Sequence, residues 1–331
     1  MSHSLLNIDA LSVHFESPRG RVRAVDGVSL SVDAGQTLAL VGESGSGKSV
    51  AALSILNLFH RADRATVSGS VRWCQRDDVS VDLNALSERE RTRFRGAEVA
   101  VIFQDPGASL NPVFTVGAQL METVARHRPK EDARQVALGL LRDVGIADPE
   151  RRLRSYPHQL SGGMRQRVMI AVALACAPRL LIADEPTTAL DVTIQSQIVR
   201  LLHELKGRLG MALLFITHDL GLVAEIADRV AVMYAGQVVE TGPVDQVLEA
   251  PAHPYTRALL ECRPQRVYRD DGTDGRVLRP IVGSPPSPTV THIGCRFASR
   301  CAQVESACLH EPPALSALGE ARSVRCFRAA V

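Results

Sequence analysis

Gly42-Glu-Ser-Gly-Ser-Gly-Lys-Ser49 gives the clearest indication of how this chain folds. It has the pattern G-x-x-x-x-G-K-[ST] and follows the apolar run Thr37–Val41, which is typical of a buried parallel strand. Residues 49–58 have the apolar content of a helix packed on a sheet. Strand, glycine-rich loop and helix in this order form the setting in which the pattern binds phosphate. The stretch therefore predicts an α/β domain that binds a nucleotide.

The residue types of this loop suit a nucleotide and magnesium. Glycines permit backbone conformations that turn successive N–H groups toward the phosphates, and the helix that follows adds its positive N-terminal end. Lys48 is predicted to reach the β- and γ-phosphates, and the Ser49 hydroxyl to bind Mg²⁺. The predicted ATP-binding residues here are Gly42, Ser44, Gly45, Ser46, Gly47, Lys48, Ser49 and Val50.

A second apolar run, residues 180–183, ends in Asp184 and Glu185. Four apolar residues followed by two acids are typical of a buried strand that delivers carboxylates to a site. Asp184 is predicted to hold Mg²⁺ through its water shell, because Mg²⁺ loses water reluctantly. Glu185 is predicted to take a proton from the attacking water. The alternative is a pair of solvated acids at a strand end.

Leu160-Ser-Gly-Gly-Met-Arg-Gln166 resembles the signature sequence of the ATP-binding cassette family, and the resemblance extends over most of the first 250 residues. It implies an ATPase that works as a head-to-tail dimer of cassettes. Ser161 suits the cap of a helix, and the bare backbones of two glycines leave amides free to meet a γ-phosphate. The residues implied to contact the nucleotide of the opposing subunit are Ser161, Gly162, Gly163, Gln166 and Asp191.

Further elements of this family stand in the expected order. Gln104, in Val101-Ile-Phe-Gln-Asp, resembles the Q-loop glutamine that senses Mg²⁺ and the attacking water. Ala189-Leu190-Asp191 is similar to the D-loop that links the two sites, and His218 resembles the switch histidine that contacts the γ-phosphate. Phe15 is the candidate for stacking on adenine, with a place in the core as the alternative.

The resemblance implies three parts for residues 1–250: a RecA-like core, an antiparallel β subdomain and a helical subdomain. Residues 105–177 are mostly helical in pattern, with helices predicted over 116–127 and 130–144. In the family, a coupling helix of the membrane subunit docks on this helical subdomain. Residues 251–331 are predicted to form a small cysteine-rich extension.

Composition excludes some classes of function. The net charge of +2 in 331 residues gives no sign of a nucleic-acid partner. The first residues lack the basic and apolar regions of a signal peptide, and no run approaches about 18 unbroken apolar residues. We therefore expect the chain to be soluble in itself, so that other chains must cross the membrane in any transport function.

The C-terminal part narrows the implied function. His253-Pro-Tyr-Thr256 and Tyr156-Pro-His-Gln-Leu-Ser-Gly-Gly resemble the ATP-binding subunits of oligopeptide, dipeptide and nickel importers. This implies an energy-coupling subunit of a peptide importer, with nickel or another small solute as the alternative cargo. The implied partners are a second ATPase subunit, two transmembrane permease subunits and an extracytoplasmic substrate-binding protein. The implied location is the cytoplasmic face of the inner membrane.

Four of the seven cysteines, Cys295, Cys301, Cys308 and Cys326, lie close together in the sequence. Four thiolates on a short, loop-rich segment suit a tetrahedral zinc ion or a [4Fe–4S] cluster, and unligated thiols are the third possibility. In the peptide importers that the chain resembles, this set is associated with an iron–sulfur cluster, which we therefore expect. Cys74, Cys176 and Cys262 are predicted to be buried as small apolar residues.

Three other classes of protein are alternatives to this importer subunit. ATPases of translation or DNA repair share the cassette but usually carry two cassettes or a long coiled coil, and this chain has one cassette and no sustained heptads. A regulatory module without turnover does not need Glu185 and His218, which are both present. An exporter is a closer alternative, but the importer-type tail favours import.

Overall fold

The computed structural model describes residues 4–18, 20–75, 79–188, 190–262, 265–268, 274–277 and 280–329. The chain forms two compact units. The first unit consists of Met1–Leu6, Ser31–Leu38 and Arg72–Thr217, and the second of Asn7–Leu30, Ala39–Val71 and His218–Val331. This division groups the residues differently from the predicted domains 1–250 and 251–331, which stay a prediction.

Parallel strands form the centre of the first unit. β6 (Val99–Ile102), β7 (Leu180–Asp184) and β8 (Ala212–Thr217) pair in parallel, with Val99 opposite Leu180 and Leu180 opposite Ala212. Every residue of β7 and β8 is buried, as expected for strands covered on both faces. The apolar run at 180–183 therefore forms a strand, as predicted, and residues 212–217 form the strand that precedes His218.

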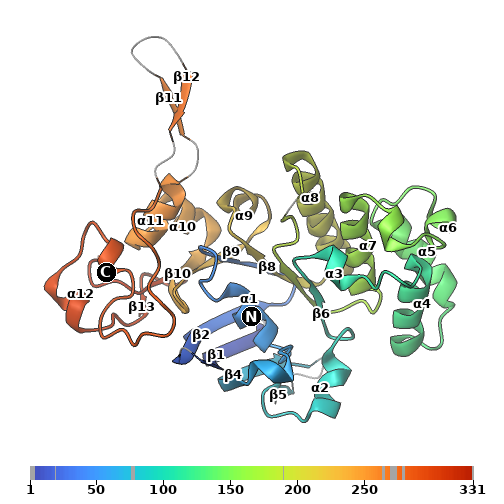
Figure 1. The fold of residues 1–331 in the computed structure, drawn as a ribbon, viewed down its shortest axis with the longest axis horizontal. Helices are drawn as coiled ribbons and strands as arrows, with labels where there is room; N and C mark the ends of the chain where they lie inside the picture. Colours follow the sequence, from blue (N-terminus) through green and yellow to red (C-terminus); the bar gives the residue numbers. More distant parts are fainter. Residues whose placement is uncertain are drawn as a thin grey trace. The chain divides into compact units, whose positions relative to one another are not determined.

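The helices of the first unit confirm the helical pattern of residues 105–177. α4, α5, α6 and α7 lie together, and α3 packs on α7 (Figure 1). α4 has the predicted bounds, but α5 begins three residues later than predicted because the Asp132 side chain caps it, accepting from the N–H groups of Arg134 and Gln135. The helical elements are α2 (Glu88–Phe94), α3 (Pro106–Ser109), α4 (Val116–His127), α5 (Ala133–Asp143), α6 (Pro149–Arg152), η2 (Pro157–Gln159), α7 (Gly162–Leu174) and α8 (Val192–Leu209).

Long strands form the N-terminal part of the chain. β1 (Ser4–Ser17) and β2 (Gly20–Asp33) have 14 residues each and are neighbours in one sheet with β4 (Ala65–Cys74). The end of β4 pairs antiparallel with β5 (Ser80–Asp82). β3 (Thr37–Val41) has the predicted bounds and is buried throughout.

The second unit contains the glycine-rich loop Gly42–Ser49 and the C-terminal tail. β9 (Arg229–Tyr234) pairs antiparallel with β10 (Gln237–Pro243), and the tail extends this sheet through β14 (Ser323–Val324) and β13 (Ser316–Ala317). The remaining elements are α1 (Lys48–Ser54), η1 (Arg61–Asp63), α9 (Leu220–Ile226), α10 (Val244–Glu249), α11 (Pro254–Glu261), β11 (Gln265–Tyr268), β12 (Asp274–Val277), η3 (Ala298–Arg300) and α12 (Ser306–His310).

The helix after the phosphate loop is shorter than predicted. α1 ends at Ser54, and Asn57 has a positive φ of 51°. Asparagine tolerates this left-handed conformation better than most residues, and a helix cannot continue through it. Residues 55–58 therefore leave the helix even though their apolar pattern suits one.

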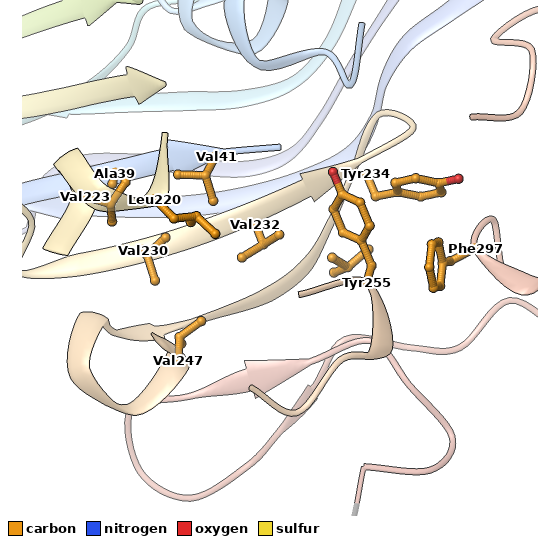
Figure 2. Packing of buried hydrophobic residues seen from close by; sticks show 11 residues of the cluster. Ala39, Val41, Leu220, Val223, Val230, Val232, Tyr234, Val247, Tyr255 and Phe297 are labelled. Carbon is orange, nitrogen blue, oxygen red and sulfur yellow. The ribbon is translucent and has the colours of Figure 1, made fainter. Parts of the chain in front are cut away.

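Aromatic side chains join the tail to the core of the second unit. Tyr234 of β9, Tyr255 of α11 and Phe297 lie side by side (Figure 2). The ring centroid of Phe297 is 5.2 Å from that of Tyr234 and 5.4 Å from that of Tyr255. Phe297 is 3% exposed, so the cysteine-bearing segment contributes to the core itself. Within the described residues, every helix is too short or too polar to span a membrane.

Candidate nucleotide-binding site

The phosphate loop Gly42–Ser49 is packed so tightly that two of its positions admit only glycine. A Cβ on Gly42 would lie 2.2 Å from the Met233 carbonyl oxygen, and a Cβ on Gly47 would lie 2.2 Å from that of Ala24. Gly47 also has a φ of 99°, a conformation that side chains disfavour. The glycines thus let the loop wrap closely against neighbouring backbone.

The polar side chains of the loop point into it. Lys48 is 4% exposed, and its Nζ donates to the carbonyl oxygens of Gly42 at 2.9 Å and Glu43 at 3.0 Å. The buried Ser46 hydroxyl has no hydrogen-bond partner among the residues that the structure describes. Buried hydroxyls are normally paired, so a ligand oxygen at this loop would complete the bonding of Ser46.

A pocket in the second unit opens beside the loop. The phosphate loop forms one wall, and β2, the β9–β10 turn and the tail form the others. It is lined by Arg23, Ala24, Glu43, Ser44, Gly45, Ser46, Tyr234, Ala235, Gly236, Pro285, Pro286, Ser287, Pro288, Val290, His292 and Arg296. The contribution of the tail was not foreseen from the sequence, because residues 285–296 are far from the loop along the chain.

The acidic residues of the first unit stand at the end of β7, as predicted. Asp184 is buried, and Glu185 adopts a left-handed backbone conformation with a φ of 45°. The Glu185 N–H donates to the Ile216 carbonyl oxygen at 3.0 Å, so β8 holds this strained turn in place. The strand thereby presents the carboxylate of Glu185 at its carboxyl end.

Two side chains hold the Glu185 carboxylate. Gln104 Nε2 donates to Oε2 at 3.2 Å, and Thr188 Oγ1 donates to the same oxygen at 2.9 Å. The structure thus brings together the predicted pair Gln104 and Glu185, although they are 81 residues apart in sequence. Thr188 was missed; a hydroxyl three residues after Glu185 in a turn is the signal that could have found it.

The signature segment begins α7. The Ser161 side chain accepts from the Met164 N–H at 3.4 Å, which confirms the predicted helix cap. Ser161 and Gly162 are exposed, whereas Gln166 is 1% exposed. Ser161 and Gly162 are therefore accessible to another subunit, whereas Gln166 is buried within its own unit. Their predicted contacts in trans stay predictions.

The other predicted residues lie in two units. Asp191 is exposed and caps α8 by accepting from the Ile194 N–H at 2.9 Å. Ala189 of the same segment lies outside the described residues. His218 is exposed between β8 and α9, and the half-buried Phe15 meets Phe59 edge to face with ring centroids 5.5 Å apart. The adenine contact of Phe15 and the phosphate contact of His218 stay predictions.

The four tail cysteines come together around a small apolar hollow. Cys295, Cys301, Cys308 and Cys326 line it with His253, Pro254, Phe297, Ala298, Gln303, Pro313, Phe327 and Arg328. Burial raises the pKa of Cys295 and of Cys301, and the other tail cysteines raise it further. This is the direction expected of neighbouring thiols.

The structure brings the four tail cysteines to one hollow but does not arrange them as a metal site. Among the described residues, no group of three or more His, Cys, Asp or Glu side chains is arranged to hold a metal ion. The hollow fits a thiolate-bound group in the chemistry of its donors, because all four tail cysteines line it. Cys74, Cys176 and Cys262 are half-buried, not fully buried as predicted, and burial raises the pKa of Cys176.

Family models match two regions of the chain. The model described as "ABC transporter" matches residues 25–188, which include the phosphate loop, the signature segment and the acids of β7. The model described as "Oligopeptide/dipeptide transporter, C-terminal region" matches residues 239–308, which include three of the four tail cysteines.

Relatives match the chain over nearly its whole length. The dipeptide transport ATP-binding protein DppD of Escherichia coli is 50% identical, with 98% of this chain and 96% of that protein covered. The oligopeptide transport ATP-binding protein AppD of Bacillus subtilis is 46% identical, also with 98% and 96% covered. A probable peptide transporter ATP-binding protein of Sinorhizobium fredii is 50% identical over 98% of this chain.

Solved structures support the same fold. The ATP-binding cassette MJ0796, in a dimeric post-hydrolysis state bound to ADP and Pi, has a TM-score of 0.61 at 28% identity and covers 72% of this chain and 98% of that one. CbiO1 of Clostridium perfringens, part of a transporter complex, has a TM-score of 0.61 at 27% identity and covers 75% and 91%. The predicted cassette fold is confirmed.

Proposed function

Since the chain belongs to the ABC transporter family of ATP-binding subunits, we propose that it powers the import of dipeptides or oligopeptides. It is an ATPase of this family that couples hydrolysis to transport. The observation that carries the peptide assignment is the 50% identity to DppD over 98% of the chain, together with the peptide-transporter match at residues 239–308. An importer of nickel or another small solute is the second candidate, because it shares the predicted tail.

The proposed chemistry is phosphoryl transfer to water. Lys48 would neutralise the β- and γ-phosphates, and Ser49, Asp184 and Gln104 would hold Mg²⁺, which would offset the negative charge of the phosphates. Glu185 orients the attacking water and accepts its proton, and His218 contacts the γ-phosphate. The donors Gln104 and Thr188 on the Glu185 carboxylate support this role, since they fix the direction in which the base points.

We propose that the site becomes complete only in a pair of cassettes. Ser161, Gly162, Gly163 and Asp191 would then face the nucleotide of the opposing subunit, whereas Gln166, which is 1% exposed, would need a local rearrangement to reach it. The exposure of Ser161, Gly162 and Asp191 supports this arrangement, as does the dimeric state of the cassette MJ0796. The partner is a second copy of this chain or a related ATPase subunit.

The membrane partners are proposed to dock on the first unit. Large apolar side chains are exposed there around the helices that follow β6: Phe103, Val113, Phe114 and Tyr156. Exposed aromatic residues of this kind mark protein interfaces. We place the chain at the cytoplasmic face of the inner membrane, bound to two permease subunits that receive substrate from an extracytoplasmic binding protein.

We propose that the four tail cysteines hold a [4Fe–4S] cluster, with zinc as the alternative. The hollow that they share supports this, and a cluster spaces its ligands more widely than a single ion does because each thiolate binds a different iron. Protein purified without oxygen should be brown and contain iron and acid-labile sulfide, and Cys301→Ser should lose both. Colourless protein with stoichiometric zinc would replace the cluster by the alternative.

Reconstitution tests the function. The chain, its permeases and its binding protein are placed in liposomes, and uptake of a labelled dipeptide and of ⁶³Ni²⁺ is measured with and without ATP inside. ATP-dependent dipeptide uptake that stops in the Lys48→Ala variant is the expected result. Nickel uptake alone would favour the second candidate, and phosphate release without uptake of either would contradict both.

A further inference from the structure

Arg300 links the tail to the phosphate loop. It ends η3, between Cys295 and Cys301, and its side chain is 4% exposed. Its Nη1 and Nη2 donate to the two carboxylate oxygens of Glu43, at 2.8 Å and 3.0 Å. This fork geometry is the strong form of an arginine–carboxylate pair. Glu43 is the second residue of the loop Gly42–Ser49, so the tail contacts the loop directly through this ion pair.

The guanidinium of Arg300 is itself firmly held. Its Nε donates to the Val282 carbonyl oxygen at 3.0 Å, and Nη1 donates to the Tyr234 hydroxyl at 3.3 Å. It also lies over the rings of Tyr234 and Phe297, at 5.7 Å and 5.9 Å from their centroids. Because these partners fix the side chain, the position of Glu43 follows from the packing of the tail.

A second contact holds the backbone of the same residue. The Glu43 N–H donates to the Tyr255 hydroxyl at 2.8 Å, and the ring of Tyr255 packs against Tyr234 and Phe297 (Figure 2). The loop is thus held at one residue through both its side chain and its amide. A loop that is ordered before the nucleotide arrives loses less entropy on binding.

The charge of Glu43 makes the pair necessary. A carboxylate in a loop that binds a polyphosphate repels the ligand, and the repulsion is strong because this side chain is only 24% exposed. Arg300 places a permanent positive charge against it. The chain therefore tolerates an acid in the phosphate loop as long as the tail supplies its counter-charge.

We propose that Arg300 is a positioning residue for nucleotide binding, which neutralises Glu43 and holds the start of the phosphate loop so that the docked tail sets the affinity for ATP. The inference rests on the proposed function, because it takes Gly42–Ser49 as the phosphate-binding loop. It makes Arg300 part of the nucleotide site although it lies 251 residues beyond the loop.

The first test measures binding of MgATP to the full chain, purified without oxygen. Arg300→Gln should weaken binding about tenfold, as expected for loss of a charge-assisted pair, with kcat of the assembled transporter little changed at saturating ATP. Arg300→Lys, which keeps the charge but loses the fork, should weaken it only about threefold. Unchanged affinity in Arg300→Gln would overturn the proposal.

A second-site substitution separates charge neutralisation from a general structural effect. Glu43→Gln removes the repelling carboxylate, so Arg300→Gln/Glu43→Gln should recover most of the lost affinity. A purely structural Arg300 predicts no recovery, and that result would also overturn the proposal. If Arg300→Gln does not fold, Arg300→Lys with and without Glu43→Gln decides in the same way.

Matched variants complete the design. Arg322 forms a buried ion pair with Glu240 at 2.5 Å in the same unit, so Arg322→Gln should lower the melting temperature without weakening MgATP binding. Lys48→Ala distinguishes the two levels of inference. Loss of binding in Lys48→Ala but not in Arg300→Gln would refute only the role of Arg300, whereas normal binding in Lys48→Ala would refute the phosphate loop assignment and with it the proposed function.

Discussion

At the level of single residues, the strained backbone of Glu185 and the two donors on its carboxylate both fix the position of this side chain. A left-handed glutamate costs on the order of 1–3 kcal/mol, and such strain persists where the surroundings enforce it. β8 enforces it through the Ile216 carbonyl, while Gln104 and Thr188 fix the carboxylate. These contacts hold the carboxylate in one direction, as its proposed role as a base requires.

Glu185→Gln is the most direct test of this base. Glutamine keeps the size and the hydrogen-bonding oxygen but cannot accept the proton, so we expect MgATP binding to remain and hydrolysis to fall by about 10²–10⁴-fold. Phosphate release and nucleotide binding are measured on the same preparation. Turnover near that of the wild type would assign the proton transfer to another group.

His253 gives the second unit a defined sensitivity to acid. Burial lowers the pKa of His253 from 6.5 to about 4. Between these values the unfolded chain binds a proton at His253 and the folded chain does not. The free energy of unfolding is therefore unaffected by His253 above pH 6.5 and decreases as the pH falls from 6.5 toward 4. The loss should approach about 3 kcal/mol.

The control is His253→Asn. Asparagine can replace the histidine Nδ1 that accepts from the Tyr255 N–H at the start of α11, but it does not titrate. Denaturant unfolding at several pH values between 4 and 7 should show a smaller decrease for the variant. Parallel curves for the two proteins would mean that another group causes the acid sensitivity.

At the level of helices and strands, we expect Gly→Ala substitutions at two helical glycines to change the stability in opposite directions. A Cβ on Gly117 in α4 would lie 2.7 Å from the Leu153 carbonyl oxygen, whereas a Cβ on Gly139 in α5 has nothing within 4 Å. Gly117→Ala should therefore destabilise the protein by about 1–3 kcal/mol through overpacking. Gly139→Ala should stabilise it by about 0.5–1 kcal/mol through helix propensity.

Thermal unfolding of the two variants checks this pair. Each changes one hydrogen to a methyl group in a helix of the first unit, so each serves as the control for the other. Equal shifts in melting temperature, in either direction, would show that the close approach of α4 to residue 153 does not limit the packing.

The elements also show how far sequence reasoning reaches. The parallel strands and α4 follow from apolar patterning, which acts over a few residues. The end of α1 and the start of α5 do not, because they depend on the left-handed Asn57 and the cap Asp132. At the candidate site, the motifs predicted residues such as Lys48 and Glu185 but not Thr188, Tyr255 or Arg300, since each of these three acts through a contact that only the folded chain creates.

At the scale of the whole molecule, pairing of cassettes is the property to test. Glu185→Gln should form a stable pair in MgATP, since hydrolysis no longer separates the subunits. Adding Ser161→Glu should prevent this pairing, because an acid would face the γ-phosphate of the partner's nucleotide. Sedimentation of the assembled cassettes measures the outcome. A pair that forms equally well in the double variant would mean that the start of α7 does not meet the nucleotide.

The packing of Phe297 limits where such subunits can be cut and recombined. In the sequence, Phe297 lies between Cys295 and Cys301, and its ring packs beside Tyr234 and Tyr255. Truncating it to alanine should cost about 3–5 kcal/mol of stability. A chimera cut at residue 250 would split that aromatic cluster between two parents. Exchangeable pieces must instead be chosen so that all three rings come from one source.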